Sequence, residues 1–182
     1  MALELKNNSI HPKEGISISD AKKIITDYLR AKGTQGDIES VAKIEEITAN
    51  EIWNDNKIQL FKVEVDYAWL YGVAIIKDKT VLKVLPGMPT ESVFVSDLDN
   101  DKIYEIYSNV YFGSGIISKE IRGFNPKTNE EYSLSGRFKG VNNDTINYTL
   151  FIKDNKLFAK TDKTSGILAL AVKDGKKLLE LK

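Results

Sequence analysis

Four acidic side chains cluster in a short stretch near the middle of the chain. Asp97, Asp99 and Asp101 are spaced by two, and Glu105 follows four residues later. In a turned loop these carboxylates can converge, and the main-chain carbonyl of Ile103 can join them. Calcium prefers six to eight oxygen ligands, and clustered like charges repel one another unless a cation offsets them. The spacing therefore predicts a calcium site.

The alternative interpretation of the same residues is a solvated acidic turn. Lys102 lies among the carboxylates and supplies a partial counter-charge. An EF-hand is excluded because the twelfth position from Asp97 is Ser108, where that motif places a bidentate glutamate. The sequence leaves both a metal loop and a solvated turn open.

Aromatic residues around a predicted hairpin form a second candidate site. Trp69 and Tyr71 belong to the hairpin, and Trp53 lies in a loop-like setting among acidic and amide residues. Such side chains can line a groove for a peptide, a glycan or a protein ligand, although aromatic residues on a sheet more often belong to the core. Trp53, Trp69 and Tyr71 are therefore the candidate ligand-binding residues.

Composition argues against an enzyme. The chain has 182 residues with one histidine, His11, and no cysteine. Cysteine nucleophiles and cysteine-ligated zinc are thus excluded, and a Ser-His-Asp or multi-histidine site is nearly so. A carboxylate pair from distant strands stays open, which leaves a small carboxylate-dependent hydrolase as an alternative. Lys plus Arg and Asp plus Glu each number 26, so the zero net charge predicts no nucleic-acid partner.

The hydrophobic pattern changes from a helical period to a strand period along the chain. Residues 1–16 are polar and predict a flexible leader, and Ser17 with Asp20 fits the capping box of a helix that follows. Alternation from Phe61 to Tyr67 predicts a half-buried strand. Short strands continue beyond the Pro86-Gly87 boundary, and the stretch from Tyr111 to Ile117 is one of those expected.

These patterns predict an α+β fold. An N-terminal helix packs on an antiparallel sheet within residues 17–88, and an all-β antiparallel unit follows within residues 89–182. The two can pack as one unit. No apolar run reaches the length of a membrane span, so no membrane insertion of this segment is expected. No signal peptide is visible, so an anchor would belong to a segment upstream of Met1.

Two stretches carry a resemblance to known families. Ser17-Ile18-Ser19-Asp20-Ala21 and Phe61-Lys62-Val63-Glu64-Val65 resemble the helix and meander of PepSY-like domains. The run from Phe94 to Tyr107 resembles the acidic loop of FG-GAP and VCBS-type repeats, which often binds calcium between two strands. Those repeats usually carry glycine where Lys102 stands. The combination is similar to uncharacterised extracellular regions of Gram-positive lipoproteins and of BlaR-type membrane sensor proteins.

The resemblance implies an extracellular or cell-surface location in a bacterium, and it supplies no activity. Together with the lack of catalytic groups, it predicts a non-enzymatic sensing or ligand-binding module. PepSY-like domains also imply an alternative, an inhibitor or chaperone-like segment of a peptidase.

Overall fold

A computed structural model describes residues 1–5, 10–33, 41–65, 70–113, 117–135, 145–162, 165–173 and 176–181. These residues form two helices and mostly antiparallel strands. The chain divides into two units: unit 1 is Met1–Glu4 with Glu91–Lys182, and unit 2 is Leu5–Thr90. The division falls at the end of strand β1 (Ala2–Leu5) and at the start of strand β6 (Thr90–Ser96).

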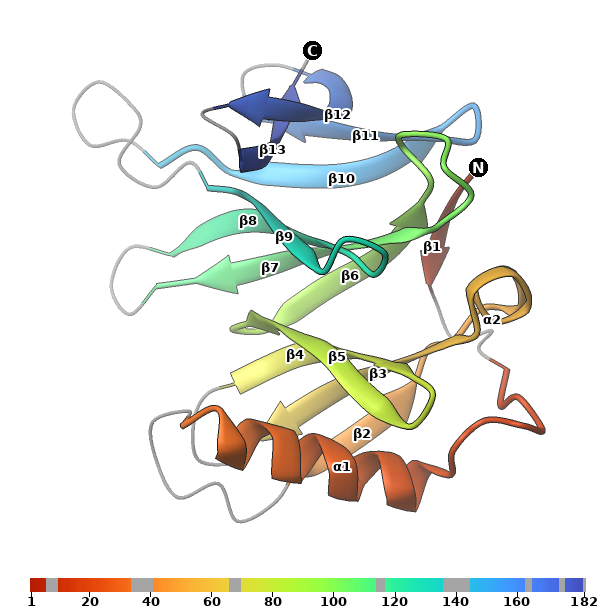
Figure 1. The fold of residues 1–182 in the computed structure, drawn as a ribbon. Helices are drawn as coiled ribbons and strands as arrows, with labels where there is room; N and C mark the ends of the chain where they lie inside the picture. Colours follow the sequence, from red (N-terminus) through yellow and green to blue (C-terminus); the bar gives the residue numbers. More distant parts are fainter. Residues whose placement is uncertain are drawn as a thin grey trace. The chain divides into compact units, whose positions relative to one another are not determined.

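Unit 2 is an antiparallel sheet covered on one face by a helix (Figure 1). Its strands lie in the order β2-β3-β4-β5, so each strand pairs with its neighbour in the sequence. The elements are α1 (Ile18–Ala31), β2 (Val41–Glu46), α2 (Asn50–Asn56), β3 (Ile58–Val65), β4 (Leu70–Lys77) and β5 (Thr80–Gly87).

Helix α1 begins at a side-chain cap and packs through one apolar face. The Ser17 hydroxyl oxygen accepts the main-chain N–H of Asp20 at 3.1 Å, which satisfies one of the donors left free at a helix start. Ala21, Ile25 and Leu29 are buried against sheet residues that include Phe61. Because these helix positions recur every three or four residues, they form a single stripe facing the sheet.

Unit 1 contains two antiparallel sheets. The first has the order β1-β6-β7-β8-β9 and the second the order β10-β11-β12-β13. Their bounds are β1 (Ala2–Leu5), β6 (Thr90–Ser96), β7 (Glu105–Phe112), β8 (Ser118–Asn125), β9 (Glu130–Leu134), β10 (Tyr148–Lys153), β11 (Lys156–Thr161), β12 (Ser165–Lys173) and β13 (Lys176–Leu181). Side chains of both sheets share one core, including Phe94, Tyr107, Ile121, Leu150 and Leu157.

The broad prediction of an α+β fold with antiparallel sheets is confirmed, but its finer form is not. The first element of the chain is strand β1, so the helix is not N-terminal. The leader predicted to be flexible includes this strand, in which Ala2 and Leu5 are buried. Pairing with β6, far along the chain, holds β1 in place, and a local pattern does not reveal such a partner.

Residues just before α1 are also held to the sheet of unit 2. The buried Gln59 side chain accepts the main-chain N–H of Ile16 at 2.8 Å and donates to Glu46 Oε1 at 2.9 Å. The other oxygen of Glu46 lies 2.7 Å from His11 Nδ1, and Thr48 Oγ1 donates to Oε1 at 3.0 Å. This buried polar network fixes the second half of the predicted leader.

The strand predicted from Tyr111 to Ile117 agrees with the structure only at Tyr111 and Phe112, because Gly113 and Ile117 lie in no strand and residues 114–116 lie outside the described residues. β7 continues to Phe112, and β8 begins at Ser118.

Neither helix in the described part of the chain combines the length and the apolar character that crossing a membrane requires.

Candidate metal centre

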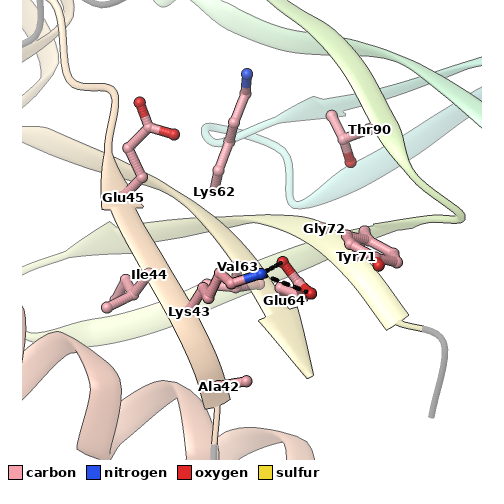
Figure 2. A pocket seen from close by; sticks show the side chains of 10 residues that line it. All are labelled: Ala42, Lys43, Ile44, Glu45, Lys62, Val63, Glu64, Tyr71, Gly72 and Thr90. Carbon is pink, nitrogen blue, oxygen red and sulfur yellow. Dashed lines mark hydrogen bonds and ion pairs between the residues drawn. The ribbon is translucent and has the colours of Figure 1, made fainter. Parts of the chain in front are cut away.

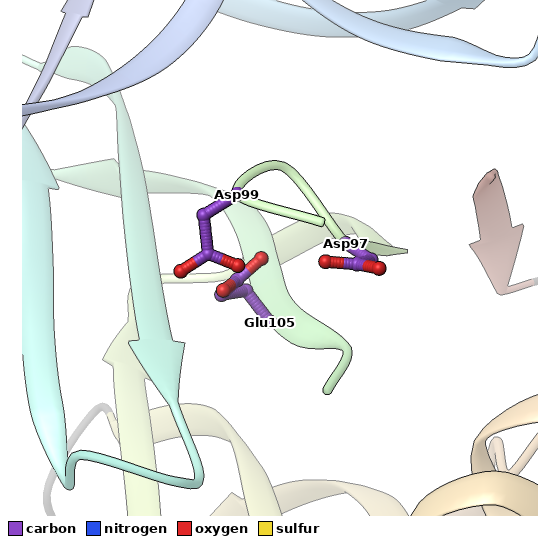
Figure 3. Close-up of side chains that lie close together, drawn as sticks. All are labelled: Asp97, Asp99 and Glu105. Atoms are coloured by element: carbon purple, nitrogen blue, oxygen red, sulfur yellow. The ribbon is translucent and has the colours of Figure 1, made fainter. Parts of the chain in front are cut away.

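The acidic loop joins β6 to β7 in unit 1 and brings three carboxylates together (Figure 3). One ligand oxygen from each of Asp97, Asp99 and Glu105 lies within 4.8 Å of the other two. Three of the four carboxylates predicted for the metal site therefore converge. We call Asp97, Asp99 and Glu105 the acidic triad.

Aspartate side chains also fold the loop itself. Asp97 Oδ1 accepts the main-chain N–H of Asp101 at 2.9 Å, and its Oδ2 accepts that of Lys102 at 3.1 Å. Asn100 and Lys102 have φ angles of 60° and 68°, the left-handed region that turns the chain sharply. The side-chain hydrogen bonds hold this turn, as is typical of Asx turns, so the capping role of the alternative interpretation is present too.

Glu105 is the buried member of the acidic triad. Its side chain is 0% exposed, its Oε2 accepts the main-chain N–H of Leu98 at 3.1 Å, and its Oε1 accepts from Asn125 Nδ2 at 3.0 Å. Burial raises the pKa of this carboxyl to about 7, the Leu98 hydrogen bond acts in the opposite direction, and the charges of Asp99 and Asp101 raise it further. A bound cation would favour the charged form and lower this pKa.

Asp101 and Ile103 take other roles. Asp101 Oδ1 accepts the main-chain N–H of Ile103 at 2.8 Å, and Asp101 Oδ2 pairs with Lys127 Nζ at 3.0 Å. Asp101 therefore stands outside the acidic triad and ties the loop to the turn between β8 and β9. Ile103 contributes its main-chain N–H to this arrangement.

A buried tyrosine lies next to the acidic triad. Tyr107 is 0% exposed, and its hydroxyl has no hydrogen-bond partner among the described residues. Burial raises the pKa of Tyr107, and the charges of Glu105, Asp99 and Asp97 raise it further. The charges of the acidic triad therefore disfavour the ionisation of a tyrosine in the core of unit 1.

The two described aromatic candidates do not share a groove. Trp53 lies on α2, half-buried, with Lys57 Nζ 5.1 Å from its ring centroid, and lines a cavity of about 310 Å³. Tyr71 lies on β4 and lines a separate groove of about 580 Å³. Trp69 lies outside the described residues.

Sequence reasoning missed the two residues that hold the acidic loop from the side. Asn125 and Lys127 belong to the end of β8 and the turn after it, and they contact Glu105 and Asp101 respectively. The Asn125-Pro126 pair signals a turn in the sequence, but no local pattern reveals which distant carboxylate this asparagine meets.

Comparisons with protein-family models, with curated proteins and with solved structures give no match for this chain. The resemblances to PepSY-like domains and to FG-GAP and VCBS-type repeats therefore stay predictions.

Proposed function

We propose that this chain is a non-enzymatic sensing or ligand-binding module of a bacterial surface protein, in which a calcium ion binds the acidic triad. The observation that carries the proposal is the approach of Asp97, Asp99 and Glu105 to within 4.8 Å, with Glu105 fully buried. Carboxylates at this separation repel one another, and burial removes the water that would screen Glu105. A divalent cation offsets both costs.

The donor set favours calcium over magnesium. Each triad carboxylate already accepts a main-chain N–H, but a carboxylate oxygen has two lone pairs and retains capacity for a cation. Calcium accepts irregular oxygen geometry, whereas magnesium requires a nearly ideal octahedron. Because only three carboxylates contribute, water or main-chain carbonyls must complete the coordination.

A small set of protein ligands implies modest affinity, and this supports the extracellular location. Weak calcium modules work with dissociation constants of about 10⁻⁴ to 10⁻³ M, a range that suits the calcium concentrations outside cells. The proposed location therefore follows from the same site as the proposed ion.

The hydrolase alternative rests on the same carboxyl group. A pKa of about 7 suits a general acid, and Asp99 is nearby. However, the Glu105 side chain is 0% exposed, so a substrate does not reach it. The geometry therefore favours a cation site over catalysis. Turnover in a glycosidase screen, abolished in Glu105→Gln, would instead favour the hydrolase.

A thermal melt with excess calcium, compared with a melt in chelator, tests the proposal. Calcium at about ten times its dissociation constant stabilises the folded state by about 1.4 kcal/mol, which for a chain of this size is a rise of about 3–6 °C in Tm. Asp99→Asn should remove that rise. Asp154→Asn is the matched control, because Asp154 is an exposed turn residue of the same unit with φ 51°. An unchanged midpoint in the parent chain would eliminate the calcium site.

A further inference from the structure

A second, chemically different site lies in unit 2. A groove of about 580 Å³ runs over strands β2, β3 and β4, with Tyr71 and Gly72 at one end (Figure 2). Ile44 and Val63 pack toward the helix side of this sheet. Because side chains alternate along a strand, their neighbours Lys43, Glu45, Lys62 and Glu64 project from the opposite face, which is the floor of the groove.

The charges on this floor fall into two cross-strand pairs that behave differently. Lys43 lies opposite Glu64 and pairs with it, with Nζ 3.0 Å from Oε2. Glu45 lies opposite Lys62 in the same register. Yet neither Glu45 nor Lys62 forms an ion pair or a side-chain hydrogen bond in the described part of the chain.

The unpaired acid and base extend into the same open space. Figure 2 shows the Glu45 carboxylate and the Lys62 ammonium extending from adjacent strands, away from the Lys43–Glu64 pair. Residues directly opposite in an antiparallel pair hold their Cβ atoms about 5 Å apart. Two opposite charges at neighbouring positions match a ligand whose ammonium and carboxylate groups are bonded to the same carbon.

We infer that this groove binds a free zwitterionic α-amino acid with a large side chain. Glu45 accepts hydrogen bonds from the ammonium group, Lys62 donates to the carboxylate, and Tyr71 contacts the side chain. The groove volume lies within the range of small-molecule sites, and it leaves room for an aromatic side chain beyond the charged end. This assignment rests on the proposed function only in taking the chain to be a ligand-binding module. It adds the class of ligand, a free α-amino acid.

Four forms of one ligand test the charge assignment. Phenylalanine, N-acetylphenylalanine, phenylalanine amide and N-acetylphenylalanine amide carry both charges, the carboxylate only, the ammonium only and neither. Binding is followed by NMR titration of the main-chain amides of Ile44, Val63 and Gly72. Because each solvent-exposed ion pair contributes up to about 1 kcal/mol, removal of either ligand charge should weaken binding about fivefold.

Variants of Glu45 and Lys62 test which protein charge interacts with which ligand charge. In Glu45→Gln, phenylalanine should bind no better than N-acetylphenylalanine binds the parent, and acetylation should have no further effect. In Lys62→Gln, amidation of the carboxylate should likewise lose its effect. Lys23→Gln removes an exposed lysine on α1 and is the matched control, with affinities equal to the parent.

Three results would overturn the assignment: the absence of saturable shifts at the groove, equal affinities for all four ligand forms, or tighter binding of trialanine than of phenylalanine. The last would indicate an extended peptide.

Each titration is run in calcium and again in chelator. Because the groove residues belong to unit 2 and the acidic triad to unit 1, amino-acid binding should not change between them. Failure of the calcium melt and failure of this titration are therefore separate outcomes.

Discussion

Asn125 and Glu105 form the side-chain hydrogen bond that closes the acidic loop onto the neighbouring strand. Asn125 Nδ2 donates to Glu105 Oε1 at 3.0 Å, and Asn125 Oδ1 accepts the main-chain N–H groups of Lys127 and Thr128. Asn125 thus organises its own turn and satisfies one oxygen of a buried carboxylate. The conformation of the loop from β6 to β7 depends in this way on the turn from β8 to β9.

The first prediction concerns pH. The folded-state pKa of Glu105 is raised from 4.5 to about 7. The folded state therefore holds the proton more tightly than the unfolded state, so the associated stability is fully present below pH 4.5 and is lost as pH rises through 7. In chelator, the free energy of unfolding should fall by about 2–3 kcal/mol between pH 4.5 and 8, relative to Glu105→Gln. Denaturant unfolding at several pH values measures this difference.

Calcium should reduce this dependence, because the cation favours the ionised carboxylate. In excess calcium the parent chain should lose less stability as pH rises than it does in chelator. Parallel pH curves for the parent and Glu105→Gln in chelator would contradict the role of Glu105.

The second prediction separates the two roles of Asp97. Asp97→Ala removes the acceptor for the Lys102 N–H and the nearer of two acceptors for the Asp101 N–H, and should lower the free energy of unfolding by about 1–2 kcal/mol even in chelator. Asp97→Asn keeps one acceptor oxygen and should cost less in chelator, yet it should lose most of the calcium response. Chemical denaturation with and without calcium measures both. Equal costs for the two variants in chelator would show that the side chain does not cap the turn.

The third prediction concerns Lys102, which has a φ of 68°. A lysine in the left-handed region carries a steric penalty that glycine avoids, although glycine loses more backbone entropy on folding. Lys102→Gly should therefore stabilise the fold by about 0.5–1 kcal/mol, and it should tighten calcium binding because a positive charge leaves the loop. Asn100→Gly is the control, since asparagine already tolerates its φ of 60°. A thermal melt of both variants distinguishes them, and destabilisation by Lys102→Gly would contradict the prediction.

The fourth prediction tests the buried network of unit 2. Gln59→Leu leaves the N–H of Ile16 without its acceptor and removes one of the two hydrogen bonds that Glu46 Oε1 accepts, and should cost about 2–3 kcal/mol. Replacing Glu46 as well removes the buried charge, so the double variant Glu46→Leu with Gln59→Leu should cost less than the sum of the two single variants. Denaturant unfolding of all four proteins gives the coupling energy. Strict additivity would show that the two side chains act independently.

Local patterns in the sequence predict a helix or strand correctly where the element packs or pairs with its neighbour in the chain. The capping of α1 follows from Ser17 and Asp20, and β3 follows from the alternation that includes Phe61 and Val63. The sequence does not predict helix α2, because the polar neighbours of Trp53, such as Asn54 and Asp55, are typical of a loop, and the N-cap residue Ala49 makes no side-chain hydrogen bond.

Strand β8 shows why other elements escaped prediction. The buried Glu120 on this strand pairs with Arg122 at 2.8 Å and accepts from Ser118 and Ser135. A strand whose buried positions include charged residues lacks the alternation of apolar and polar side chains that predicts a strand. The acidic triad was predictable in part, because Asp97, Asp99 and Glu105 share one short loop, whereas the diversion of Asp101 depends on a lysine from another turn.

Strand β1 lies beside β6 in the five-stranded sheet, although residues 6–89, nearly all of unit 2, lie between them in the sequence. A ribosome therefore releases β1 long before its partner strand exists. The strands of unit 2 are neighbours in the chain and can pair as they emerge, since local contacts form faster than distant ones. β1 must wait for β6, so a strand that leaves the ribosome before unit 2 is expected to join its sheet only after the strands of unit 2 have paired.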